Sequence, residues 1–167
     1  MPKVIFIGDD HFDDKTIKNN LDRFKKKYNL SQKYALLLEV DYSDEPETNT
    51  NDAVGIVTEK KTGKEDWAVL TNLASKADCC YGFDHSAKTF TVFRQNKQYQ
   101  NIRKLIDIIR KWQPSMDIIV VVGTAHLEEN KTENGWIPHH ERLDKEIGNT
   151  YCYFTYEDGE EFDYDDS

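Results

Sequence analysis

The sequence has few cysteines, no excess of basic residues and no long apolar run. The three cysteines, Cys79, Cys80 and Cys152, form no C-x-x-C pair and no even-numbered framework, so a thiolate zinc site and a disulfide-stabilised fold are excluded. We expect all three to be small buried side chains. No run reaches the roughly 18 apolar residues that span a membrane, and the apolar start of the chain is too short for a secretory signal. The sequence therefore predicts a soluble, cytoplasmic protein.

Basic residues are outnumbered as well: the chain has 22 Lys and Arg but 31 Asp and Glu, which gives a net charge of -9. A nucleic-acid partner is excluded, since binding to phosphates needs a basic surface. The acids are concentrated in residues 41–52, which hold five acids and no base, and in residues 157–167, which hold seven acids and no base. We expect one domain over residues 1–156 and a disordered acidic tail over residues 157–167 that can bind a partner.

Apolar runs alternate with segments that have helical periodicity. Buried strands are predicted at residues 3–7, 34–40, 79–83, 117–123 and 150–156, and helices at residues 17–28, 64–77, 99–112 and 138–148. Residues 53–59 are interpreted as a strand or loop edge, and residues 88–94 as an edge strand or hairpin. Because the strands are apolar throughout, both faces of their sheet need cover. The sequence therefore predicts an α/β three-layer sandwich, with a mainly parallel sheet flanked by helices.

Polar side chains follow these strands at their carboxyl ends, which is where parallel sheets bind their ligands. Two strands end in Gly-x-x-His, which places His11 and His126 just after them, and Gly82 to His85 has the same spacing. Glu39 lies in an otherwise apolar strand, where a carboxylate must be paired or hydrogen-bonded. Histidine is the natural general base near neutral pH. We therefore expect His11, Glu39 and His126 to converge as catalytic residues.

Arginine is a candidate fourth member of this site. Arg103 lies at the border of the apolar stripe of its predicted helix, where a guanidinium can clamp a carboxylate or phosphate. Arg94 and Arg110 are weaker competitors. His139 and His140 are interpreted as surface residues or a first-turn feature. His85 is expected to pair with Asp84 or to lie beyond the site.

The segments IFIGDDHFDD, ALLLEVD, CCYGFDH, NIRKLIDII and VVVGTAHLE together resemble the superfamily that joins erythromycin esterases, ChaN-like haem-uptake lipoproteins and TraB/TIKI proteins. Their order matches a first Gly-x-x-His loop, a strand-end acid, an Arg-bearing helix and a second Gly-x-x-His loop. The first motif departs from the superfamily, because Asp9 stands where a Glu commonly follows the glycine. The chain is also shorter than typical members and lacks the insertions that shape their pockets.

The residues and the resemblance together predict a hydrolase that activates water against an ester, amide or related bond in a small molecule or peptide. The erythromycin-esterase branch implies metal-free attack by water. The TIKI branch implies a divalent metal, and Asp9, His11, Glu39 and His126 are the candidate ligands for Mn, Co or Zn. The alternative is a non-catalytic α/β domain that binds a ligand or a protein. Nucleotide-binding domains are disfavoured, because both glycine-rich phosphate motifs are absent.

Overall fold

The computed structural model describes residues 2–10, 14–43 and 68–165. Its strands are β1 (Val4–Asp9), β2 (Tyr34–Asp41), β3 (Cys79–Asp84), β4 (Asp117–Gly123), β5 (Thr150–Thr155) and β6 (Glu161–Tyr164). They form one sheet in the order β3-β2-β4-β1-β5-β6, with every pairing parallel except that of β5 with β6. The strand or loop edge expected at residues 53–59 lies outside the described residues.

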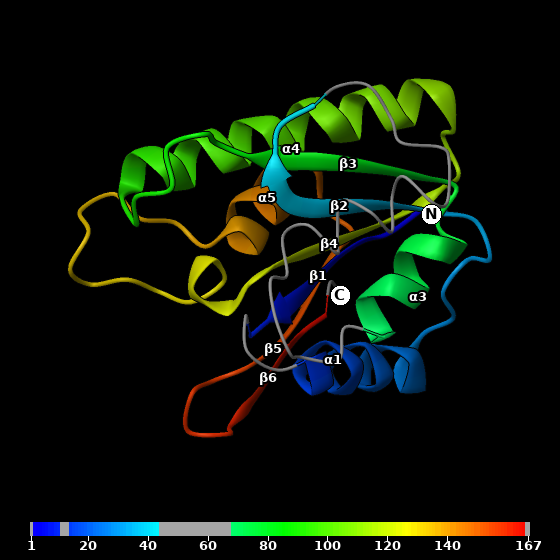
Figure 1. Cartoon of the computed structure of the whole chain (residues 1–167), viewed down its shortest axis with the longest axis horizontal. Helices are drawn as coiled ribbons and strands as arrows, with labels where there is room; N and C mark the ends of the chain where they lie inside the picture. The colour runs from blue at the N-terminus through cyan, green and yellow to red at the C-terminus, as the bar shows by residue number, and fades with distance from the viewer. Residues whose placement is uncertain (1, 11–13, 44–67, 166–167) are drawn as a thin grey trace.

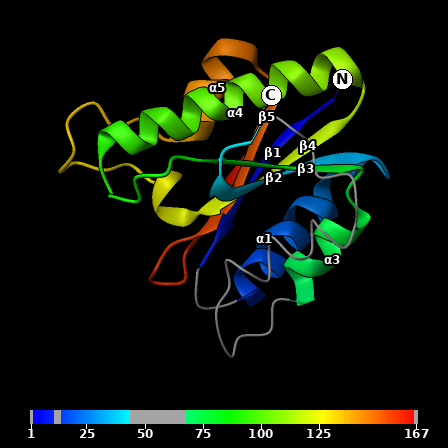
Figure 2. The same ribbon diagram turned by 45° about the horizontal axis from the view of Figure 1, so that its top comes forward.

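Helices cover both faces of this sheet, as Figures 1 and 2 show. One face packs against α1 (Asp14–Lys27) and α3 (Ala68–Lys76), through Ile17, Phe24 and Leu73. The other face packs against α4 (Val92–Trp112) and α5 (His139–Ile147), through Ile102 and Leu143. The two apolar cores confirm the predicted α/β sandwich with a mainly parallel sheet.

The described residues also bear on two simpler expectations. Cys79, Cys80 and Cys152 are free and buried, which confirms that they are small core side chains. No helix within the described ranges is long and apolar enough to cross a membrane.

The first two turns of α4 differ from the sequence prediction. Residues 88–94 were expected to form an edge strand or hairpin, but α4 already begins at Val92. Thr91 is its N-cap, with an extended backbone and a side chain that accepts a hydrogen bond from the Arg94 amide. This cap satisfies a free amide of the first turn and fixes where the helix starts. The longer helix brings Arg94, Gln95 and Gln98 to the end of the sheet.

The expected disorder of the acidic tail is wrong for the residues that the structure describes. β6 pairs antiparallel with β5, and Arg23 on α1 holds it by binding the Asp163 carboxylate and the carbonyl oxygens of Phe154 and Phe162. Burial opposes the charge of Asp163, but hydrogen bonds from Arg23 and Lys27 outweigh it and lower the pKa of this carboxyl group. Charge pairing with the basic end of α1 therefore orders a segment whose composition indicates disorder.

Candidate functional site

A pocket of about 700 Å³ opens at the carboxyl ends of the parallel strands. Asp9 ends β1, Glu39 lies near the end of β2, and His126 ends the short 3-10 turn η1 (Thr124–His126) that follows β4. Further lining residues include Phe90, which precedes α4, Arg94 in the first turn of α4, and Tyr156 and Glu157 in the turn between β5 and β6. The pocket therefore lies where the fold class leads us to expect a ligand.

Two glycines allow the backbone to close around this edge. A Cβ on Gly8 would lie 2.5 Å from Cβ of Phe154 and 2.9 Å from the Thr124 hydroxyl oxygen. A Cβ on Gly82 would overlap the carbonyl oxygen of Asp41, in the stretch where the register of β2 against β3 shifts. Both positions therefore need glycine because of a close backbone approach.

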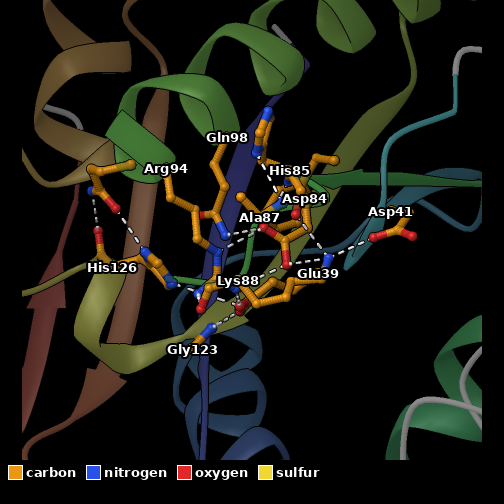
Figure 3. Close-up of polar contacts among 12 residues, drawn as sticks. Glu39, Asp41, Asp84, His85, Ala87, Lys88, Arg94, Gln98, Gly123 and His126 are labelled. Carbon is orange, nitrogen blue, oxygen red and sulfur yellow. Dashed lines mark hydrogen bonds and ion pairs between the residues drawn. The ribbon is translucent and has the colours of Figure 1, made fainter. Parts of the chain in front are cut away.

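Glu39 is a buried carboxylate with two fixed partners. Its side chain is only 7% exposed. The Gly123 amide donates to Oε1 at 2.8 Å, and Nη2 of Arg94 donates to Oε2 at 2.9 Å (Figure 3). These bonds compensate the cost of burying the charge and hold the carboxylate in one orientation.

Asp84, at the end of β3, completes an ion-pair network behind Glu39. Arg94 donates to both of its oxygens, with Nε at 3.0 Å and Nη2 at 2.9 Å, and Gln98 and Lys88 add hydrogen bonds at 2.9 and 3.1 Å (Figure 3). Burial opposes ionisation of Asp84, but the hydrogen bonds from Arg94, Gln98 and Lys88 outweigh it and lower its pKa. One buried guanidinium therefore holds two buried carboxylates.

Gln95 fixes the tautomer of His126. The Gln95 amide nitrogen donates to the carbonyl oxygens of His126 and Ile137, at 3.0 and 2.9 Å, so its oxygen faces Nδ1 of His126 at 2.7 Å. Because that oxygen can only accept, we assign the ring hydrogen to Nδ1. The lone pair of neutral His126 is then on Nε2, which lies 3.6 Å from Oε2 of Glu39. This is the arrangement of a proton acceptor beside a carboxylate that stabilises the protonated ring.

An aromatic stack holds the His126 ring in place. Trp136 and His139 stack on it with centroid distances of 5.9 and 5.8 Å, and Phe90 lies 5.6 Å away. Burial, followed by the nearby His126, lowers the pKa of His139 well below its usual range, so His139 is neutral. Its Nε2 pairs with the Gln98 side-chain oxygen at 2.9 Å. Of the two stacked histidines, His126 is the one that lines the pocket.

The structure brings together only part of the predicted site. Asp9, Glu39 and His126 line the pocket, whereas His11 lies outside the described residues. Arg103 is placed elsewhere, because its guanidinium pairs with Asp107 and Glu146.

Arg94, which the sequence made a weaker candidate than Arg103, is the arginine that lines the pocket and binds a carboxylate there. The sequence interpretation missed Asp84, Gln95 and Gln98. Extending the apolar stripe of α4 two turns towards its start would have placed Arg94, Gln95 and Gln98 on the buried face. His85 lies beside Asp84, to which its backbone amide donates.

The described donors do not fit a metal ion. No group of three His, Cys, Asp or Glu in the described ranges is placed to hold one. Both oxygens of Glu39 already accept hydrogen bonds, and one of these comes from the cationic Arg94. A divalent ion at this carboxylate would compete with the guanidinium for the same oxygen.

His139 and His140 are in the first turn of α5, which confirms the first-turn alternative, but both are buried, so the surface alternative is wrong. The His140 ring lies between Phe162 and Tyr164 of β6, at centroid distances of 5.6 and 5.1 Å. Burial lowers the pKa of His140 to about 4 from the ordinary 6.5, so its ring is neutral at pH 7. β6 thus covers His140, whereas His139 packs against Phe6 and Tyr99.

This burial predicts acid sensitivity. An unfolded His140 takes up a proton below about pH 6.5 while the folded form does so only near pH 4, so stability is complete above pH 6.5 and falls between these values. At pH 5 the loss from this residue is about 2 kcal/mol. We expect His140→Phe to remove this part of the loss, measured as the difference in urea-unfolding free energy between pH 7 and pH 5. An equal loss in both proteins would contradict it.

Comparison with known proteins adds information on the fold. No protein-family model and no curated protein matches the chain. Among solved structures, it is similar to RRSP, a MARTX toxin effector domain from Vibrio vulnificus, with a TM-score of 0.53 and 16% sequence identity. The match covers 99% of this chain and 36% of that chain, so this chain spans about a third of the RRSP structure. At this identity the likeness shows a shared fold and nothing more.

Proposed function

We propose that the chain is a hydrolase that activates water at His126 and Glu39. The observation that carries this proposal is the Nε2 of His126, whose lone pair is fixed by Gln95 and lies 3.6 Å from the Glu39 carboxylate in the strand-end pocket. The Gly-x-x-His loops and the strand-end acid also support membership of the erythromycin esterase, ChaN and TraB/TIKI superfamily. Within it, the occupied oxygens of Glu39 favour the metal-free branch.

The proposed reaction is a hydrolytic acyl transfer in which every proton is accounted for. Nε2 of His126 takes a proton as the water oxygen attacks the carbonyl carbon, and Glu39 stabilises the resulting imidazolium. The same proton then passes to the oxygen or nitrogen of the leaving group as its bond to carbon breaks. Arg94 pairs with Glu39 and fixes the orientation of its carboxylate. His11 remains a predicted second histidine of this site.

A panel of nitrophenyl esters, amides and short peptides, assayed with and without a chelator, tests this proposal. We expect turnover that the chelator does not remove. The isosteric Glu39→Gln should lower kcat by about 10²-fold, because the imidazolium loses its counter-charge. Glu160→Gln, which makes the same change at an exposed residue of the β5–β6 turn, is the control. Ligand binding without turnover would favour the non-catalytic alternative, and full activity of Glu39→Gln would contradict the assigned roles.

A further inference from the structure

Phe90 is the one large, wholly apolar side chain among the described residues that line the strand-end pocket. The rest of this lining is mostly polar, with carboxylates, threonine hydroxyls and the His126 ring. Phe90 is 48% exposed, although it packs against the buried rings of Trp136 and His126. An apolar group that enters the pocket therefore buries most of its surface by packing on Phe90.

The chain on both sides of Phe90 is held by Arg94, the arginine of the ion-pair network. Nη1 of Arg94 donates to the carbonyl oxygen of Lys88 at 3.3 Å, and the Arg94 amide donates to the side-chain oxygen of Thr91 at 3.4 Å. The ring itself lies against Trp136 at a centroid distance of 4.9 Å. Because its position is fixed before a ligand arrives, a ligand that packs on Phe90 meets little cost of ordering it.

Phe90 also lies next to the proposed base. The centroid of its ring is 5.6 Å from that of His126, which is within the range of a direct aromatic contact. In the proposed reaction, Nε2 of His126 activates the water, so the carbonyl carbon that is attacked lies close to this nitrogen. A group attached next to the bond being hydrolysed is then within reach of the exposed part of Phe90.

The neighbours of Phe90 indicate an aromatic group rather than a charged one. Aromatic rings attract one another in tilted and offset pairs, and Phe90 already forms such a pair with Trp136, at an interplanar angle of 45°. A ring on the ligand extends this arrangement. An anionic group gains nothing from an apolar ring, and Glu128 and Glu157 in the pocket lining repel it.

We propose that Phe90 determines substrate specificity by binding an aromatic group beside the bond that is hydrolysed. The substrates are then esters or amides that carry an aromatic ring close to the carbonyl, on its acyl side or on its leaving-group side. That these molecules are substrates rests on the proposed hydrolase function. Binding of the ring at Phe90 rests on the pocket alone.

Three simple esters test this specificity, because benzyl acetate has a ring on the leaving-group side, ethyl phenylacetate has one on the acyl side, and ethyl acetate has none. We expect the better of the two aromatic esters to exceed ethyl acetate in kcat/KM by at least about tenfold, a difference of about 1.4 kcal/mol. Phe90→Ala should reduce this preference to less than about threefold, mainly through a higher KM, since ground state and transition state both contact the ring. Phe90→Leu, which keeps an apolar side chain, should lie between the two.

Phe93→Ala is the matched control. Phe93 is 54% exposed, but it packs against His85 and Lys97 and does not line the pocket. We expect its preference to stay within about twofold of that of the wild type. Circular dichroism shows whether each variant is folded, and if Phe90→Ala is not, Phe90→Leu decides. A wild-type preference in the folded Phe90 variant, or equal losses at Phe90 and Phe93, would overturn the role of Phe90.

Two ketones test binding without hydrolysis. Benzylacetone and methyl propyl ketone have a CH₂ group in place of the ester oxygen of benzyl acetate and ethyl acetate. We expect benzylacetone to bind at least about tenfold more tightly than methyl propyl ketone, to lose this advantage in Phe90→Ala, and to shift the His126 ring resonances in NMR spectra of the full chain. Such binding without turnover of any ester would support the role of Phe90 and count against the hydrolase. Hydrolysis of all three esters with equal kcat/KM would overturn only the specificity.

Discussion

Replacing Arg94 with methionine should lower the free energy of unfolding by about 3–5 kcal/mol, the cost of leaving buried charges without their partner. Arg94 donates to Glu39 and Asp84, which are 7% and 1% exposed. After the substitution, Asp84 keeps hydrogen bonds from Lys88 and Gln98, and Glu39 keeps the one from the Gly123 amide. Two buried carboxylates then lie close together without the guanidinium between them.

Urea unfolding monitored by circular dichroism measures this effect. Arg103→Met is the matched control, because Arg103 is on the same helix and also binds two carboxylates, but these are exposed. Pairs of that kind contribute up to about 1 kcal/mol each. The difference between the two variants should shrink at acid pH, as protonation removes the unpaired charges left by Arg94→Met. Similar losses for both variants at pH 7 would show that the ion-pair network does not stabilise the fold.

The central sheet could be predicted because most of its strands coincide with apolar runs in the sequence. In β4 the five apolar residues 118–122 are all buried, as a strand covered on both faces of the sheet requires. The start of α4 was harder, because its buried face carries Arg94, Gln95 and Gln98 instead of apolar residues. Their burial depends on acceptors supplied by β2, β3 and η1, which lie between 10 and 55 residues away in the sequence. Local periodicity alone does not show those partners.

The C-terminal strand was missed for a related reason. Phe162 and Tyr164 alternate with acids, which is the period of an edge strand, but the acidic composition predicts disorder when taken alone. Arg23 and Lys27 on α1 offset this acidic charge and stabilise the strand, because both form ion pairs with Asp163. Ordering β6 also places the turn containing Glu157 at the pocket. Part of the chain's acidity thus belongs to the candidate site.

The Gly-x-x-His spacing is followed by different placements of the histidine at two positions: His126 lines the strand-end pocket and His85 does not. After β4, the η1 turn brings His126 back over the sheet edge, where Gln95 binds its ring. After β3, the ring of His85 instead accepts a hydrogen bond from the Ala87 amide and lies against Phe93. The motif is the same, but the contacts that decide its use come from α4. Spacing therefore predicts candidates, and tertiary packing selects among them.

His126→Phe should reduce kcat by about 10²–10⁴-fold on any ester or amide that the wild type hydrolyses, the range for loss of a general acid–base group. Phenylalanine keeps a ring of similar size between Trp136 and His139, so the aromatic stack can persist. It removes both ring nitrogens, and with them the proton acceptor beside Glu39. The Gln95 oxygen also loses its partner, which costs about 1–3 kcal/mol of stability.

The His85→Phe variant separates a catalytic effect from a structural one. His85 has the same spacing from its glycine, but it does not line the strand-end pocket. We expect its kcat to stay within about twofold of the wild type, since the substitution leaves the acid–base pair intact. Steady-state kinetics at a temperature where circular dichroism shows both variants folded makes the comparison direct. If folded His126→Phe retained wild-type kcat, proton transfer would have to be assigned to another residue, and His11 would be the first to replace.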